Sequence, residues 1–400
     1  MNRSLVSHWQ WPKRQFPYAT VGLVLLNVLM ALVTLPNSDI SGSRNLFDVF
    51  GFIPKDPRAA AVVSSLFLHA DAIHLLTNMI FLWVFASHVE SAIGLVPTLL
   101  LYLAGGVTAV MTHWAVSIEM SPVTASQPLI GASGAVASII GYFALRYYRS
   151  SVKMMFGTGW RTSALWIPVW VAALVWIGIQ SAGAISSLMD NQSNNIGYWA
   201  HLGGFGFGMI VGALWRAGNV GERESSIEQA EDALRLSNPA TALNYLRPLL
   251  LNNPEDAEVL AVTGAAWEQL GDRELMGADW AKAIRFGIDT GQFNIARECA
   301  IRMKDRHLIG AVAPTQRYRL GCLCFEYGDP EMGVSLLESI IVGTGYSADR
   351  EHSLIKLADY YLRGRKSPER AHKLLERFLT DYPGSIFADT AQGWIKQFHS

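Results

Sequence analysis

A serine and a histidine, each at the start of an apolar stretch, are the residues of this sequence best suited to chemistry. Ser133 lies in the segment Gly131-Ala132-Ser133-Gly134, and a largely apolar run follows it. His201 begins a second apolar run, which contains Gly204 and Gly208. A serine becomes a nucleophile when a base such as imidazole lies within hydrogen-bonding distance. Such chemistry requires that two distant parts of the chain bring these side chains together.

The composition divides the chain into an apolar part and a polar part. Of the 400 residues, 50% are hydrophobic and only 16% are charged. A soluble protein of ordinary composition has about 25% charged residues. The apolar residues concentrate before about Trp215, and the remainder is typical of soluble helices. The formal net charge of -1 gives no reason to expect nucleic acid as a partner.

The apolar part predicts six helices that span a lipid bilayer. Their approximate ranges are 18–35, a segment from 60 or 69 to 85, 95–110, 131–147, 165–179 and 197–215. Each is close to the roughly 20 residues needed to cross the hydrocarbon core. Basic residues precede the first segment and follow the fourth: Arg3, Lys13, Arg14, Arg146, Arg149, Lys153 and Arg161. Basic flanks favour the cytoplasmic side, which predicts that both chain ends are cytoplasmic.

This topology places three polar side chains in one layer near the outer face. Ser133, His201 and Asn78 each lie in the outer part of a helix that descends from outside. Polar groups within hydrocarbon are costly unless they are paired, so each requires a reason. Each of these three residues, considered alone, also has an ordinary structural explanation. Ser133 can bond to its own helix, His201 can lie at the interface, and Asn78 can join two helices.

Small residues favour contact between the two helices that carry Ser133 and His201. Gly204 and Gly208 share a helical face with His201. Gly131 and Gly134, on either side of the serine, allow a neighbouring helix to approach closely. These glycines are therefore expected to pack the helices together and to bring the imidazole to the hydroxyl.

The same region can stabilise a developing negative charge. Ser133 is expected near a helix amino terminus, where unpaired backbone N–H groups and the helix dipole favour an anion. His74 and Asn78, one helical turn apart, can donate further hydrogen bonds to the same oxyanion. The pattern predicts acyl transfer through an activated serine hydroxyl, which needs no cofactor.

Together these motifs resemble the three signatures of rhomboid intramembrane serine proteases. The similarity rests on the Gly131-Ala132-Ser133-Gly134 segment, on Ala200-His201 with Gly204 and Gly208, and on His74 four residues before Asn78. It covers about residues 17–215, and the order of six helices also matches. The resemblance implies a Ser133/His201 dyad without an acidic third member, an oxyanion hole that includes Asn78 and His74, and transmembrane proteins as substrates. His69, Glu90 and Gly94 also fit positions of the family pattern.

Two departures from the family pattern keep another function class open. Ala137 stands where many members place an aromatic ring against the histidine, and the usual Trp-Arg pair is absent between Asn37 and His69. The alternative is a non-catalytic scaffold that binds transmembrane clients. A transporter is less favoured because the spans lack charges. A zinc site at His69, His74 and His201 is not expected, since no carboxylate or thiolate accompanies them.

The sequence after Trp215 predicts a separate cytoplasmic domain. The domains are expected at 1–16 (cytoplasmic segment), 17–215 (membrane protease), 216–226 (linker) and 227–400 (helical repeats). Gly264, Gly271 and Asp272 recur in type at Gly321, Gly328 and Asp329, and Ala371, Phe378 and Pro383 mark a last helical pair. This pattern resembles a degenerate tetratricopeptide array, which implies a protein or peptide partner. An unrelated helical bundle is the alternative.

The positions of the three cysteines indicate the redox environment of the polar part of the chain. Cys299, Cys322 and Cys324 all lie in the polar part, and no second pair completes a zinc site. Reduced thiols in a cytosolic domain are expected. The low cysteine count and two cytoplasmic ends favour a bacterial plasma membrane, with an organelle membrane as the alternative. The fold class expected is all-α.

Overall fold

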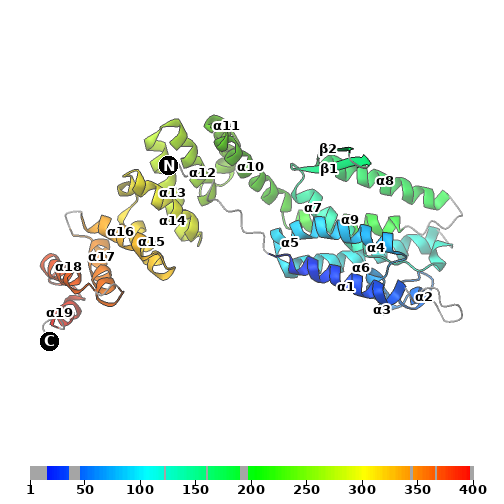
Figure 1. The fold of residues 1–400 in the computed structure, drawn as a ribbon, viewed down its shortest axis with the longest axis horizontal. Coiled ribbons are helices and arrows are strands. Elements are labelled where there is room, and N and C mark those ends of the chain that lie inside the picture. Colours follow the sequence, from blue (N-terminus) through cyan, green and yellow to red (C-terminus); the bar gives the residue numbers. More distant parts are fainter. Residues whose placement is uncertain are drawn as a thin grey trace. The chain divides into compact units, whose positions relative to one another are not determined.

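The computed structural model describes residues 16–35, 46–120, 123–158, 161–189, 197–342, 346–364 and 367–396. Apart from one β-hairpin and short connections, these residues are helical (Figure 1). The chain divides between Ser225 and Ser226 into two compact units, here the membrane unit and the C-terminal unit. The basic amino-terminal segment expected at 1–16 lies outside the described residues, except for Phe16.

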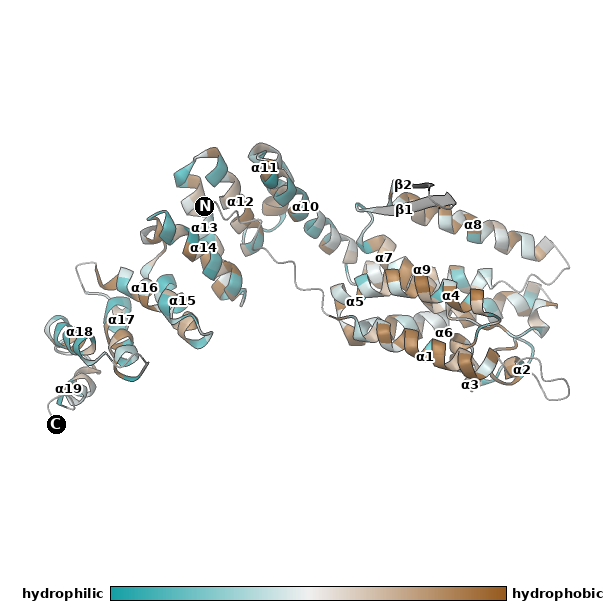
Figure 2. Ribbon diagram, in the orientation of Figure 1, coloured by the Kyte–Doolittle hydropathy of each residue, from teal (hydrophilic) through white to brown (hydrophobic). Residues whose placement is uncertain are grey.

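The membrane unit contains a helix in each of the six predicted segments. Figure 2 shows that these helices carry much hydrophobic colour along their length. In chain order they are α1 (Tyr18–Thr34), α4 (Ala72–Phe81) continued through a π-helical turn (Leu82–Ala86) into α5 (Ser87–Ile93), α6 (Leu95–Met120), α7 (Ser133–Arg146), α8 (Val169–Met189) and α9 (Tyr198–Leu214). Two shorter helices, α2 (Leu46–Phe50) and α3 (Ala59–Ser64), lie between α1 and α4.

Among the described residues, three helical segments are long and apolar enough to cross a bilayer. They are Ala72–Ile93, Leu95–Met120 and Val169–Leu188. Tyr18–Thr34 and Ser133–Arg146 are apolar but shorter. The apolar helices indicate a membrane protein, whereas the six-span topology stays a prediction.

Two helices extend further than the sequence predicts. The third segment was expected to end near Val110, with a polar loop from Ser117, but α6 continues to Met120. His113 and Ser117 are buried in the helix interface, so their polarity does not mark a loop. The second segment starts at Ala72, where Asp71 accepts a hydrogen bond from the backbone N–H of His74, and it continues past Phe85 to Ile93.

The fifth segment differs for a non-local reason. It was expected from Leu165 to Ile179, but α8 begins at Val169 and runs to Met189. Residues Arg161–Pro168 instead form strand β2, which pairs antiparallel with β1 (Ser151–Thr158). The basic segment that follows α7 is therefore part of a hairpin.

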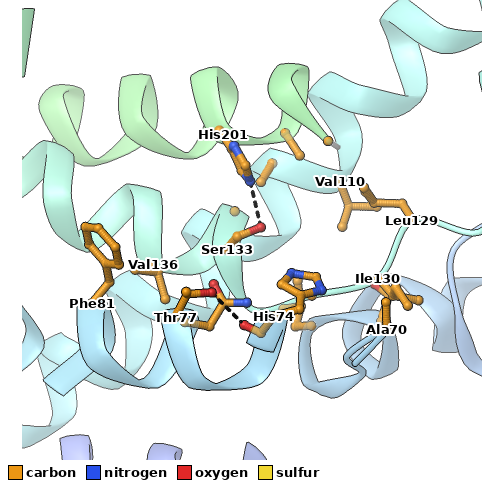
Figure 3. Close-up of a pocket in the computed structure, with 18 of the residues that line it drawn as sticks. Ala70, His74, Thr77, Phe81, Val110, Leu129, Ile130, Ser133, Val136 and His201 are labelled. Atoms are coloured by element: carbon orange, nitrogen blue, oxygen red, sulfur yellow. Dashed lines mark hydrogen bonds between the residues drawn. The ribbon is translucent and has the colours of Figure 1, made fainter. Parts of the chain in front are cut away.

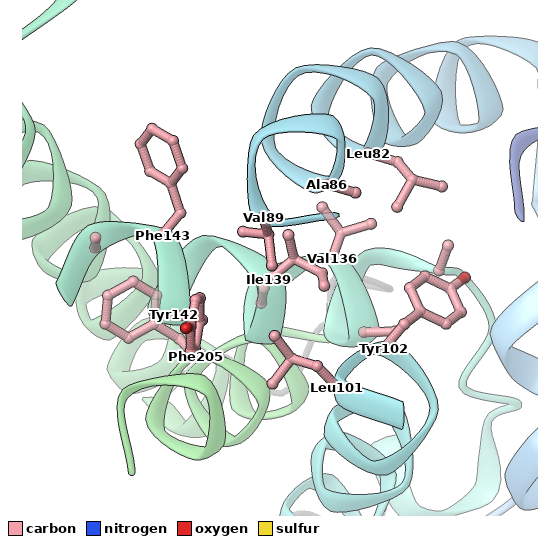
Figure 4. Packing of buried hydrophobic residues seen from close by; sticks show 14 of the residues in the cluster. Leu82, Ala86, Val89, Leu101, Tyr102, Val136, Ile139, Tyr142, Phe143 and Phe205 are labelled. Carbon is pink, nitrogen blue, oxygen red and sulfur yellow. The ribbon is translucent and has the colours of Figure 1, made fainter. Parts of the chain in front are cut away.

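Helix α7 lies at the centre of the membrane unit. Val136, Ile139 and Tyr142 are almost completely buried, and they pack against Leu82 and Val89 of the second segment, among others (Figure 4). Most α7 residues after the first are buried, and many are small. Neighbouring helices can therefore approach α7 from several sides.

The expected linker at 216–226 is helical. Helix α10 runs from Ala217 to Arg235 without a break. Its first part packs against the end of α7, where the Arg146 guanidinium forms a 2.7 Å ion pair with Glu224. The Arg146 side chain is buried, so the ion pair satisfies a charge that would otherwise be costly. This tertiary contact explains why a segment with glycine and polar residues does not form an irregular linker.

The C-terminal unit consists of helices joined by short turns. Gly271 and Gly328 have positive φ values of 80° and 82°, and each precedes an aspartate that caps the next helix. The helices are α11 (Pro239–Asn252), α12 (Ala257–Leu270), α13 (Arg273–Asp289), α14 (Phe293–Asp305), α15 (Pro314–Glu326), α16 (Pro330–Ile341), α17 (Ala348–Asp359), α18 (Pro368–Asp381) and α19 (Ala388–Lys396).

Similar close contacts occur in two of these helical hairpins. In the α12–α13 hairpin, a Cβ at Gly264 would collide with the Trp280 ring, which is completely buried. In the α15–α16 hairpin, Gly321 takes the corresponding place and faces Leu337. The two pairs have the same sequence spacing, as expected for repeats of one structural unit.

Candidate active site

The start of α7 holds Ser133 at a defined position. Gly131 has a φ of 124°, a backbone conformation that favours glycine, and its N–H donates a 2.9 Å hydrogen bond to the Ser65 carbonyl. Ser133 is the first residue of α7. Its hydroxyl therefore lies beside first-turn N–H groups that have no acceptor within the helix.

Helix α9 brings His201 to this serine. His201 lies in the first turn of α9, and its Nε2 is 2.7 Å from Ser133 Oγ (Figure 3). The two residues are distant in sequence, and both line the same cavity. A separation of 2.7 Å between a hydroxyl oxygen and an imidazole nitrogen indicates a strong hydrogen bond.

Glycines allow the backbones of α7 and α9 to touch. A Cβ at Gly204 would collide with the carbonyl oxygen of Gly134, and a Cβ at Gly208 would collide with that of Ser138. On the α6 side, a Cβ at Gly134 would lie 2.6 Å from the Ala109 Cβ. The structure therefore places these three glycines at close helix contacts, whereas Gly131 serves the turn before α7.

Helix α8 supplies a contact to the other nitrogen of the imidazole. His201 Nδ1 lies 2.8 Å from the side-chain oxygen Oε1 of Gln180. Gln180 was not predicted from the sequence, because the fifth span was expected to end at Ile179. A polar side chain within an apolar span was the available signal, since such residues commonly mark functional sites.

Aromatic rings surround His201 although Ala137 lacks one. Ala137 is buried in α7. Trp176 on α8 and Tyr198 on α9 each have a ring centroid 6.4 Å from that of His201. Trp176 also stacks on Phe205 at 5.2 Å. The packing around the imidazole therefore comes from α8 and α9.

His74 and Asn78 lie across the cavity from His201, on α4. His74 Nε2 would be 3.0 Å from a Cβ at Gly131, so this imidazole closely flanks the turn before Ser133 (Figure 3). Asn78 is buried, and within the described part of the chain its amide nitrogen Nδ2 has no hydrogen-bond partner. Both side chains line the cavity that contains Ser133. The Asn78 amide and the His74 imidazole can each donate a hydrogen bond.

The cavity has a volume of about 430 Å³ and a mixed lining. Polar groups on its wall include Ser65, Asp71 and Thr77, and apolar groups include Leu129 and Trp176. The lining therefore combines hydrogen-bonding groups with apolar surface, as is usual for ligand-binding pockets.

The other histidine and carboxylate positions have different surroundings. His69 is completely buried with its ring 5.2 Å from that of His74, and among the described residues neither of its ring nitrogens has a partner. No group of three metal-binding side chains occurs in the described ranges. Glu90 accepts 2.8 Å hydrogen bonds from the N–H groups of Ala19 and Thr20, so it caps the start of α1.

The three cysteines are free thiols in the C-terminal unit. Burial is the main reason that the pKa values of Cys299 and Cys324 are raised to about 12. Because a thiolate is the reactive form, these two side chains are poor nucleophiles at neutral pH.

The membrane unit is thus a bundle of apolar helices with a serine and a histidine in hydrogen-bonding contact beside a cavity. Residues 57–217 match the family model of the rhomboid domain. A zebrafish (Danio rerio) protein, Presenilin-associated rhomboid-like protein A, mitochondrial, is 32% identical to this chain over 83 residues. The alignment covers 21% of this chain and 21% of that relative, so the chain spans about a fifth of the length of the relative. Residues 57–217 therefore contain a rhomboid domain.

Proposed function

We propose that this protein is an intramembrane serine endopeptidase that cleaves transmembrane segments of other membrane proteins. The observation that supports the proposal best is the 2.7 Å separation between Ser133 Oγ and His201 Nε2 in a cavity lined by potential oxyanion donors. Ser133 is the nucleophile and His201 is the general base.

The proposed reaction has two stages. In the first, Ser133 Oγ attacks the scissile carbonyl carbon and His201 Nε2 takes the hydroxyl proton, while the Asn78 amide, the His74 ring and the Ser133 N–H stabilise the oxyanion. The C–N bond then breaks, and His201 protonates the leaving amine. In the second stage, water adds to the acyl ester with its proton passing to His201, which returns a proton to Ser133 as the ester breaks. The reaction needs no cofactor.

In the proposed topology, all six apolar helices span the bilayer and both chain ends are cytoplasmic. The cavity then opens toward the outer side, where water is available for hydrolysis and a substrate helix emerges from the lipid. A bacterial plasma membrane is the proposed location. Cysteine-scanning accessibility of Ser126 and Ser226, on opposite sides in this topology, tests the orientation.

A serine-reactive probe tests the proposed activity. We expect a fluorophosphonate to label Ser133 in the full chain reconstituted in liposomes, because phosphonylation requires an activated hydroxyl. A co-reconstituted single-span protein should be cut near its outer end. The alternative function, a scaffold that binds transmembrane clients without cutting them, predicts neither labelling nor cleavage.

Asn78 provides a test of the oxyanion site. We expect Asn78→Ala to lower kcat by about 10²–10³, because removal of one oxyanion donor typically has this effect. KM should change little, since the donor acts mainly on the transition state. Ile80→Ala on the same helix is the control, because the Ile80 side chain is exposed and is not among the residues that line the cavity. Equal activity of the two variants would remove Asn78 from the proposed mechanism.

We further propose that the C-terminal unit is a tetratricopeptide-like domain that binds a peptide or protein on the cytoplasmic side. Its support is the repeated hairpin geometry around Gly264 and Gly321. Deletion of residues 236–400, which follows the end of α10, should leave probe labelling intact but change which clients are cut or the size of the native complex. No change in either property would contradict this role.

A further inference from the structure

The imidazole of His201 has a defined partner on each ring nitrogen. Nε2 faces Ser133 Oγ at 2.7 Å, and Nδ1 faces Gln180 Oε1 at 2.8 Å. A neutral imidazole carries one N–H and one lone pair. An amide oxygen only accepts hydrogen bonds, so the Gln180 contact requires the proton on Nδ1 and leaves the lone pair on Nε2.

We propose that Gln180 is the positioning residue of the dyad, and that it holds His201 in the tautomer that can accept the Ser133 proton. This inference rests on the proposed peptidase activity. In serine proteases with an acidic third member, a carboxylate performs this role. Here an uncharged amide takes its place. It orients the ring without placing a fixed negative charge in the apolar interior, where an unpaired charge is costly.

The packing of α8 supports this assignment. Trp176 lies one helical turn before Gln180, so both residues project from one side of the helix toward α9. The Trp176 ring is tilted by 38° relative to the His201 ring, with their centroids 6.4 Å apart, while Gln180 Oε1 lies 2.8 Å from Nδ1 at the edge of the imidazole. One helix thus restrains both the tilt and the rotation of the imidazole.

Helix α8 is the least buried of the three long apolar segments in the described part of the chain. Only 11% of the apolar window in Val169–Leu188 is buried, compared with 39% in Leu95–Met120. Ile179, beside Gln180 in sequence, is 61% exposed. A polar side chain on such a lipid-facing helix would be unfavourable without a specific partner. The partner that the structure provides is His201.

Two substitutions with opposite expectations test the proposal. Gln180→Leu removes the acceptor, and we expect kcat to fall roughly tenfold, as for the loss of one hydrogen bond, with little change in KM. Gln180→Glu retains an acceptor and adds negative charge, which stabilises the imidazolium. We expect it to remain active and to move the acid limb of the pH–kcat profile about one unit higher.

The shift of the acid limb in Gln180→Glu must be distinguished from the titration of other groups near His201. These are His74 on α4 and His113 on α6, which face it across the helix interfaces, while Ser133 on α7 and Tyr198 on α9 complete its surroundings. None of these is altered in the Gln180 variants. The matched control is Ile179→Met, a neighbouring lipid-exposed position on α8.

The experiment uses the full chain in liposomes and adds a readout that does not depend on catalysis. Nitrogen-15 NMR of the imidazole, assigned through its loss in His201→Ala, should show the Nδ1–H tautomer in the unmodified protein and a tautomer mixture in Gln180→Leu. The positioning role is contradicted if Gln180→Leu matches Ile179→Met in kcat and tautomer, and the acid limb of Gln180→Glu is unmoved. Absence of probe labelling in the unmodified protein would instead contradict the peptidase proposal, whatever the tautomer.

Discussion

Ser133→Ala and His201→Ala are each expected to abolish substrate cleavage and probe labelling, with a loss on the order of 10⁴-fold or more. Ser133→Ala removes the atom that forms the acyl bond. His201→Ala leaves the hydroxyl without a base, and a serine hydroxyl is a weak nucleophile unless its proton is accepted. Because the two groups act as one unit, the double variant should be no worse than either single variant. The measurement is cleavage of a co-reconstituted single-span protein over time.

Matched controls distinguish lost chemistry from lost structure. Ser138 lies further along α7 and bonds to the carbonyls of Leu101 and Ala135. His88 lies on α5, with its Nδ1 against the carbonyl of Val84. Ser138→Ala and His88→Ala should retain cleavage. Full cleavage by Ser133→Ala or His201→Ala would end the dyad mechanism and would favour the scaffold.

The sequence predicted the helices of the membrane unit more reliably than their ends. Apolar runs identify helices because burial and lipid exposure both require apolar side chains. The ends depend on contacts that a local pattern does not contain. Ser117 was expected to begin a loop but is buried, and residues 165–168 were expected in the fifth helix but belong to strand β2. The Arg146–Glu224 ion pair similarly joins segments that are distant in sequence.

The site residues likewise divide into those that a local sequence pattern predicts and those that depend on contacts between distant segments. Ser133 and His201 could be predicted because a nucleophile and a base in apolar surroundings are rare and occur beside glycines. Their contact is now a structural observation, while their catalytic roles, and those of His74 and Asn78, stay predictions. Gln180 was missed because its partner lies on another helix and its span was ended one residue too early. The substitute for the absent ring at Ala137 was equally hidden, since Trp176 comes from α8.

Gly204→Ala is expected to reduce activity at least 100-fold although it alters no group that takes part in the chemistry. The added Cβ would collide with the backbone carbonyl oxygen of Gly134, one residue after the serine. A backbone cannot rotate away as a side chain can, so α7 and α9 must separate. A displacement of about 1 Å between reacting groups can lower a rate by about 10²-fold. Overpacking of this kind also costs about 1–3 kcal/mol of stability.

The control for this prediction is Gly206→Ala on the same helix. A Cβ at Gly206 has no atom within 4 Å, so both variants carry the same gain in helix propensity but only one meets α7. Tm in detergent should fall for Gly204→Ala and stay constant or rise for Gly206→Ala. Labelling of Ser133 well below both Tm values separates geometry from unfolding, because the folded Gly204→Ala protein should still react slowly. If the two variants label equally fast, close backbone contact between α7 and α9 is not what brings the imidazole to the hydroxyl.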